Sequence, residues 1–267
     1  MRRLYGFTLI ELVITLVLVG IVIAVVAPLA AQPFRAYIAT QNRSQLVSQA
    51  DADFFLLLRD AHAALPNSLR VNAAGTAVEM LHVQNAGRYR TVPSSLGGSQ
   101  ILDFSTAVSS FQVDGPLAQP PAGTQLVIYN TGQPGADAYA GDPVITPVST
   151  VVTATASSPE SLLSLSVPHQ FPFPSPMQRF YLVDTPITYA CLNGQLWRYD
   201  QYPIQSVVAS PPAGARASLV GTQLLSCQFS YIAGTSSRAG LLSVQLQLNA
   251  NNESLTLMEQ ANVPNGI

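Results

Sequence analysis

The strongest pattern in the sequence is an uninterrupted apolar run near its beginning. Leu12–Ala31 contains no charged side chain, and its length of about 20 residues is enough to cross a hydrocarbon core of about 30 Å. Arg2 and Arg3 precede the run, and the positive-inside tendency keeps that end in the cytoplasm. The pattern therefore predicts one membrane-spanning helix, with the bulk of the chain on the periplasmic side.

A second helical pattern continues directly from the first. Over Phe34–Leu65, apolar residues recur at intervals of three and four, which is the spacing of one helix face. The apolar positions are Val47, Ala50, Phe54, Leu57, Leu58, Ala61 and Leu65, and the polar remainder includes Arg43, Gln45, Gln49, Asp53 and Arg59. Pro66-Asn67-Ser68 predicts the end of the helix. We therefore expect residues 34–66 to form an amphipathic continuation whose apolar stripe packs on a sheet.

From residue 67 onward, short β-branched and apolar runs alternate with segments rich in Gly, Pro and Ser. Candidate strands are Val78–Val83, Ile101–Phe104, Gln125–Tyr129, Val144–Thr155 and Leu162–Val167, and candidate loops are Pro116–Pro121, Thr131–Asp142 and Pro168–Pro176. Ile187–Leu192 and Gln195–Tyr199 flank Asn193-Gly194, which is a type I′ turn sequence. This hairpin places Cys191 opposite Leu196.

The last third of the chain alternates between apolar and polar residues. Leu225, Cys227, Phe229 and Tyr231 form one apolar set, and Leu242, Val244, Leu246 and Leu248 form another. After a turn at 250–252, Ser254–Gln260 is expected to return antiparallel. One buried face and one solvent-exposed face are typical of an antiparallel sheet beneath a helix. The predicted fold class is α+β, with a long N-terminal helix packed on a β-rich globular domain over residues 67–267.

Composition argues against several classes of function. Charged residues make up 10% of the 267 residues, the net charge is −2, and all 12 basic residues are arginine. Because no basic stripe is present, we expect no nucleic-acid binding. The two cysteines, Cys191 and Cys227, lie in the part expected to be exported, where an even count favours a disulfide over two buried thiols.

Catalytic and metal-binding patterns are missing from the sequence. His62, His82 and His169 are scattered, no spacing fits a zinc site, and neither a Gly-x-Ser-x-Gly elbow nor a phosphate loop is found. We therefore expect no enzyme activity, no metal and no cofactor. Two weaker candidates are a calcium loop at Gly135–Asp142, set against a solvated loop, and an adhesive patch at Trp197, Tyr199 and Tyr202, set against core packing.

The start of the chain, Arg2-Arg3-Leu4-Tyr5-Gly6-Phe7-Thr8-Leu9-Ile10-Glu11, resembles the type III signal of type IV prepilins and of type II secretion pseudopilins. The resemblance implies that prepilin peptidase removes residues 1–6 by cutting between Gly6 and Phe7, and then methylates the amine of Phe7. Residues 7–33 would remain as the transmembrane half of the helix. The alternative is an ordinary signal peptide, which is cut after the apolar run at a small-residue site.

Glu11 and Pro28 interrupt the apolar character of the predicted span. A carboxylate inside a membrane costs up to about 2.5–3.5 kcal/mol at the centre, so it is a functional candidate. Thr8 lies three residues before Glu11, which is also the spacing of a capping box. The resemblance implies a partner in assembly, the amine of Phe7 on an adjacent subunit. Pro28 is either a tolerated kink or a point where filament helices bend, with Pro33 as a second break.

Downstream motifs resemble one group within this family. They are Arg59-Asp60, Ala64–Ser68, the hairpin Tyr189-x-Cys-x-Asn-Gly-x-Leu-x-Arg198 and Asn262-Val263-Pro264. The group comprises the large, O-type minor pilins of mannose-sensitive haemagglutinin pilus systems. The resemblance implies a subunit at the start or tip of a pilus, anchored in the bacterial inner membrane and later displayed at the cell surface. Its partners would be prepilin peptidase, other minor and major pilins, and the inner-membrane assembly platform. The alternatives are a J-type pseudopilin of type II secretion and a pilus-tip adhesin.

Overall fold

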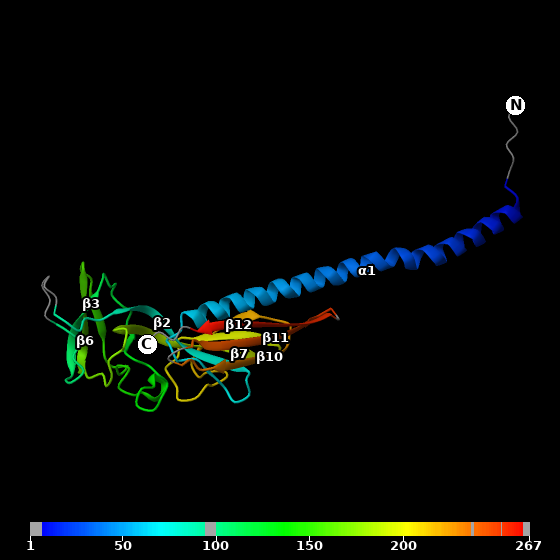
Figure 1. Ribbon diagram of the computed structural model, residues 1–267. Helices are drawn as coiled ribbons and strands as arrows, with labels where there is room; N and C mark the ends of the chain where they lie inside the picture. The colour runs from blue at the N-terminus through cyan, green and yellow to red at the C-terminus, as the bar shows by residue number, and fades with distance from the viewer. Residues whose placement is uncertain (1–6, 94–99, 236–237, 252, 264–267) are drawn as a thin grey trace.

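The computed structural model describes residues 7–93, 100–235, 238–251 and 253–263, and it has the α+β organisation that the sequence predicts. One long helix, α1 (Leu9–His62), extends from a β-rich domain, and only the C-terminal part of the helix contacts that domain (Figure 1). Pro28 and Pro33 both lie within the helix, which follows a curved path. The apolar half therefore projects free of the domain.

The helix ends at His62, before the predicted end at residue 66. The backbone after it leaves the helix because it pairs with the neighbouring strand β2 (Ala77–Arg88). The amide of Leu65 donates to the carbonyl of Leu81 at 2.8 Å, and the amide of Val83 donates to the carbonyl of Ala63 at 3.1 Å. Sheet pairing thus stops the helix one turn ahead of Pro66.

The first sheet is antiparallel and has six strands in the order β1-β2-β7-β8-β9, with β4 paired to β7. Besides β2, its strands are β1 (Arg70–Val71), β4 (Gln125–Val127), β7 (Arg179–Leu192), β8 (Gln195–Asp200) and β9 (Arg216–Gly221). The predicted hairpin is β7–β8, and Cys191 lies opposite Leu196 as expected. Asn193 and Gly194 both have positive φ, as a type I′ turn requires.

The second sheet contains β10 (Leu224–Ile232), β11 (Gly240–Ala250) and β12 (Glu253–Val263), in that order. The predicted alternation along β11 is confirmed, because Leu242, Val244, Leu246 and Leu248 are all fully buried. The prediction for Leu225 was wrong. A bulge between Leu224 and Ser226 shifts the register, so that Leu224 turns inward and Leu225 is 61% exposed.

The third sheet belongs to a separate lobe between β2 and β7. Its strands are β3 (Val108–Asp114), β5 (Val152–Thr155) and β6 (Glu160–His169), and the one-turn helix η1 (Ala138–Ala140) lies in the connection between β4 and β5. The lobe packs on the first sheet in a second hydrophobic core, where Phe111, Leu163 and Phe171 lie in one cluster with Leu126 of β4 and Leu182 of β7. β3 and β6 lie at the end of the molecule opposite the start of α1 (Figure 1).

Two of the predicted strands do not form as expected. Ile101–Phe104 is not a strand, although Leu102 is buried and its amide donates to the carbonyl of Arg90 at 3.2 Å. Of Val144–Thr155, only Val152–Thr155 is a strand. The residues before Val152 are held by isolated backbone hydrogen bonds and by a turn, in which the amide of Thr150 donates to the carbonyl of Pro147. Proline lacks the amide that a continuous ladder needs.

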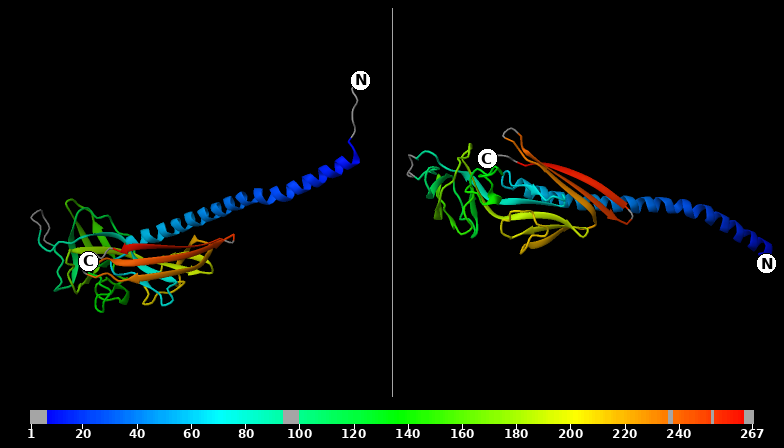
Figure 2. Two further views of the ribbon diagram at one scale, coloured as in Figure 1. Left: turned by 45° about the vertical axis from the view of Figure 1, so that its right-hand side comes forward. Right: turned by 90° about the horizontal axis from the view of Figure 1, so that it is seen from below.

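The main core lies where the C-terminal half of α1 packs against the first and second sheets (Figure 2). Ala50, Phe54, Leu57 and Ala61 from the predicted stripe are each no more than 4% exposed. The prediction for Asp53 was wrong. The sequence pattern placed this residue on the polar face of the helix, whereas its side chain is buried and only 2% exposed. The helix therefore presents a carboxylate to the interior of the domain.

Candidate functional site

The N-terminal end of α1 contains the residues that the prepilin resemblance selected. Phe7 is 73% exposed and precedes the helix. Thr8 is the N-cap, and its hydroxyl oxygen accepts a hydrogen bond from the amide of Glu11 at 3.3 Å. The Thr8 side of the capping box is therefore present, and it fixes where the helix begins. Gly6, on the other side of the predicted cleavage point, lies outside the described residues.

The apolar half of α1 is exposed on every side. Large aliphatic side chains from Leu9 to Leu29 are 47–81% exposed, and α1 is the one helix among the described residues long and apolar enough to cross a membrane. A helix that is apolar all round needs an apolar environment on every face. The domain does not provide this environment, so it must come from lipid or from other chains.

Glu11 is the one charged residue on this apolar half. Its side chain is exposed, and it has no hydrogen-bond or ion-pair partner among the residues that the structure describes. Phe7 lies four residues before Glu11 in the same chain, and both side chains are exposed. The arrangement can therefore accept a cationic partner from outside the subunit.

A polar network joins the C-terminal end of α1 to the β7–β8 hairpin. Asp60 accepts hydrogen bonds from the Tyr189 hydroxyl at 2.9 Å and from Nε of Arg198 at 2.7 Å. Burial, followed by the nearby Asp60 carboxylate, raises the pKa of Tyr189. Arg59, the other member of the Arg59-Asp60 pair, contacts Asp60 from the surface at 3.1 Å. The structure thus brings together two motifs that are far apart in the sequence.

Arg198 extends this network to a second carboxylate, Asp200, which Arg216 also binds at 2.8 Å. Burial acts to raise the pKa of Asp200, but the hydrogen bonds from Arg216 and Arg198 outweigh burial and lower it. The guanidinium of Arg198 is only partly exposed and is held between two carboxylates. The network fixes the helix end on the first sheet, and its charged groups pair with one another.

Asp53 lies deeper in the same helix–sheet contact. Burial raises its pKa to about 6, and its Oδ2 atom has no hydrogen-bond partner. A Cβ added to Gly221 of β9 would lie 2.1 Å from that oxygen, so the strand backbone packs directly against the carboxylate. Sequence reasoning missed Asp53, although its position three after Ala50 and four before Leu57 places it inside the apolar stripe.

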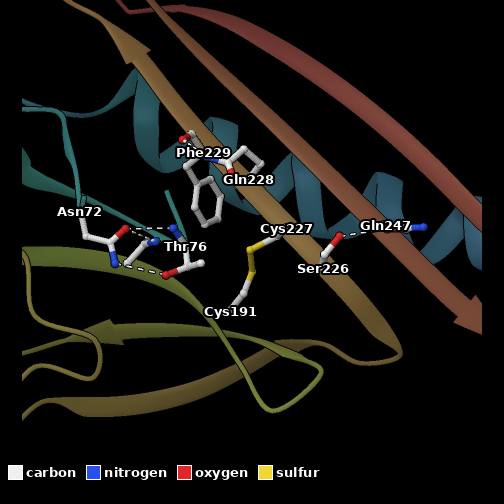
Figure 3. Close-up of a disulfide and its surroundings, with 9 residues drawn as sticks. Asn72, Thr76, Cys191, Ser226, Cys227, Gln228, Phe229 and Gln247 are labelled. Carbon is white, nitrogen blue, oxygen red and sulfur yellow. Dashed lines mark hydrogen bonds between the residues drawn. A yellow bond between two sulfur atoms is a disulfide. The ribbon is translucent and has the colours of Figure 1, made fainter. Parts of the chain in front are cut away.

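A disulfide between Cys191 of β7 and Cys227 of β10 connects the first two sheets (Figure 3). Beside it, the turn from Asn72 to Thr76 also holds both sheets. The carbonyl of Thr76 accepts from the amide of Cys191 at 3.0 Å, and the carbonyl of Gly75 accepts from the amide of Phe229 at 2.7 Å. The cysteines therefore have a structural role in joining the sheets.

The remaining candidates have local partners. His62 contacts the carbonyl of Leu58, His82 contacts Asp184, and His169 contacts the carbonyl of Pro143. Within the described residues, no three His, Cys, Asp or Glu side chains gather as metal ligands would.

The acidic loop and the aromatic patch are also explained by local packing. Asp137 accepts from the amide of Tyr139, and Asp142 accepts from the amide of Asp137, so both carboxylates stabilise the loop itself. In the aromatic group, Tyr199 and Tyr202 are buried and Trp197 packs against their cluster. These contacts favour core packing over an adhesive surface.

Comparison with known proteins identifies one family feature. Residues 1–27 match the family model described as the prokaryotic N-terminal methylation motif. No curated protein and no solved structure matches the chain. The motif implies processing by prepilin peptidase and association with pilin machinery and with a membrane. Proteins of this kind are structural and not enzymatic. Together with the exposed apolar helix, the match supports a type IV pilin-like protein of a pilus or a pseudopilus.

Proposed function

We propose that the protein is a minor pilin that helps to start assembly, or occupies the tip, of a type IV pilus of the mannose-sensitive haemagglutinin kind. The main support is the extra lobe. β2 and β7 are neighbours in the first sheet, yet the chain between them builds a third sheet, which packs in a second hydrophobic core apart from the one that contains α1. A globular domain enlarged in this way is difficult to repeat at every position of a tightly wound fibre, but it can be accommodated at the end of the fibre.

The proposed assembly step uses the first residues of the mature chain. Prepilin peptidase cuts between Gly6 and Phe7 and methylates the amine of Phe7, which stays positively charged. Glu11 of the next subunit then pairs with this amine inside the fibre. Opposite charges attract far more strongly at low dielectric than in water, and each charge left unpaired there is penalised. The pair therefore selects one axial register between neighbouring helices.

The proposal is tested by intact mass of the membrane-extracted protein and by counting pili. Wild type is expected to lack residues 1–6 and to have one methyl group, whereas Gly6→Leu keeps residues 1–6 and abolishes piliation. Gly20→Leu is the matched control for processing, because a Cβ at Gly20 meets nothing within 4 Å in the subunit. It is expected to be cleaved as wild type is. Mature protein that begins after residue 31 would refute the proposal.

A pseudopilin of type II secretion is the alternative that shares the N-terminal motif. It predicts the same cleavage and the same role for Glu11, so mass measurements do not separate the two. Deletion does. Loss of surface pili with normal secretion supports the pilus role, and loss of secreted enzymes with normal pili supports the secretion role.

One observation favours a tip adhesin as a second candidate. A cavity of about 520 Å³ lies between the η1 loop and the segment after β8, with Tyr139, Pro143, Ile145, His169 and Ile204 among its lining residues. Its size is within the range of small-ligand sites. Saturable binding of intact pili to cells, lost when Ile204→Trp fills the cavity, would support this role. Unchanged binding in that variant would exclude the cavity as the adhesive site.

A further inference from the structure

A short part of α1, between the apolar run and the domain, has exposed apolar side chains that nothing in the subunit covers. Phe34, Tyr37 and Ile38 are 70%, 68% and 55% exposed. At about 100° per residue, the three side chains fall within one sector of about 100°. This sector is roughly opposite to the stripe that packs on the sheets. Because Leu46 is the first residue that the domain buries, the domain cannot cover this face.

The distance along the helix places this segment at a particular depth. From Phe7 to Phe34 the helix rises about 40 Å, and to Ile38 about 46 Å. A bilayer with its headgroup layers is about 40–45 Å thick. When Phe7 lies at the cytoplasmic surface, Phe34 and Ile38 therefore lie at the opposite headgroup layer. Arg35, next to this face, is the first charged residue after Glu11.

We propose that Phe34, Tyr37 and Ile38, together with Arg35, form an interfacial anchor that binds the phospholipid headgroup layer on the outer face of the inner membrane. Aromatic side chains favour this layer because the ring is apolar while the phenol hydroxyl of Tyr37 can reach water. The guanidinium of Arg35 can reach lipid phosphates while its stem stays among acyl chains. The inference rests on membrane anchoring and is independent of whether the protein serves a pilus or a pseudopilus.

The side chains themselves favour lipid over a second helix as the occupant of this face. Close helix–helix contacts in membranes use small residues that let the backbones approach. This face instead presents two aromatic rings and an isoleucine directly after the span. It is also adjacent to the longest apolar segment of the chain, so lipid that surrounds the span reaches it without a gap.

The anchor also sets the distance between the domain and the membrane surface. Asn42 and Gln45 of α1 line a small polar cleft with Ala250 and Asn251 at the tip of the β11–β12 hairpin. Asn42 is about 6 Å beyond Ile38 along the helix, and Leu46 is about 12 Å beyond it. The domain is therefore held just clear of the headgroups by one to two turns of helix.

Depth-dependent quenching of tryptophan fluorescence tests the anchor. The full-length mature protein is placed in phosphatidylcholine–phosphatidylglycerol vesicles with bromine near the top or near the end of the acyl chains. Three variants are compared with wild type, whose single tryptophan, Trp197, lies in the domain and gives the background. Tyr37→Trp probes the anchor, Ser48→Trp is the matched control at an exposed position farther along the same face, and Leu18→Trp reports insertion of the span.

The added emission of Tyr37→Trp is expected to fall about twofold with shallow bromines and little with deep ones, whereas that of Ser48→Trp stays unchanged. Equal quenching of these two variants would overturn the anchor, and so would protection of Tyr37→Trp that grows with the protein-to-lipid ratio, because a second copy would then cover the face. If Leu18→Trp escapes deep quenching, membrane anchoring itself fails and the inference fails with it.

Discussion

Replacing Asp53 by asparagine is expected to stabilise the protein at neutral pH. Burial raises the pKa of Asp53 from 3.8 to about 6, so at pH 7 the folded protein must hold an ionised carboxylate in a site that opposes ionisation. The packing of Gly221 against the carboxylate leaves no space for a compensating side chain from β9. Asparagine has nearly the same shape and removes the charge.

The size and sign of the effect follow from linkage. Below pH 3.8 the carboxyl group is protonated in both the folded and the unfolded chain, so its ionisation does not lower the free energy of unfolding. Between pH 3.8 and about 6, the unfolded chain loses the proton while the folded chain keeps it, so stability falls as pH rises. At about 1.4 kcal/mol per pKa unit, the total loss is up to about 3 kcal/mol. Above pH 6 it stays constant.

The assay is thermal unfolding of the full-length protein in detergent micelles, followed by circular dichroism from pH 4 to pH 7.5. At about 2–4 °C per kcal/mol for a domain of this size, Asp53→Asn is expected to raise Tm by up to about 6–12 °C at pH 7.5. The gain should disappear towards pH 4. Asp51→Asn, at an exposed position on the same helix, is the matched control and should leave the pH profile unchanged. A wild-type profile in Asp53→Asn would refute the reasoning.

Three further changes test the contacts that hold α1 and the sheets together. Asp60→Ala leaves the partly buried Arg198 without one of its two carboxylates and should cost about 3 kcal/mol in the free energy of unfolding, measured with denaturant; a cost below 1 kcal/mol would contradict a structural role for this pair. Cys191→Ser with Cys227→Ser opens a link between residues 36 apart in sequence and should cost about 3–4 kcal/mol, whereas an unchanged unfolding midpoint would show that the Asn72–Thr76 turn alone joins the sheets. Gly221→Ala should lower Tm because its Cβ meets the carboxylate of Asp53, and Asp53→Ala should recover most of the loss in the double variant; independent, additive effects would argue against the contact.

Elements with a strong local signal could be predicted from the sequence. Leu242 to Leu248 alternate strictly with polar residues, and a strand with one buried face must show this pattern. The Asn193-Gly194 turn specifies the hairpin register through backbone conformations that few other residue pairs adopt. The apolar half of α1 is equally clear, because its composition alone demands a membrane or its equivalent. In each case the signal itself lies within one short, continuous segment of the sequence.

Features that depend on contacts between distant segments could not be predicted in the same way. The bulge that turns Leu225 outward arises from the pairing of β10 with β11, and no residue in the segment itself signals it. The end of α1 at His62 depends on β2, which begins 15 residues later. Asp53 is buried because Gly221 makes room for it, and Asp60 meets Arg198 only after the hairpin folds against the helix.

The two halves of α1 are stabilised by different surroundings, and this difference bears on how assembly is directed. The C-terminal half is held by the domain core, whereas the apolar half has no partner within the described part of the chain. Moving the apolar half from lipid to a bundle of sister helices exchanges one apolar environment for another, so its aliphatic side chains provide little preference for any one register. Under the proposed function, Glu11 is the group whose environment changes most in that step, since it has no side-chain partner among the described residues of its own chain and would gain the Phe7 amine of a neighbouring chain. On this proposal the preference for one register comes from Glu11, and we expect Glu11→Gln to insert in the membrane normally while failing to enter fibres.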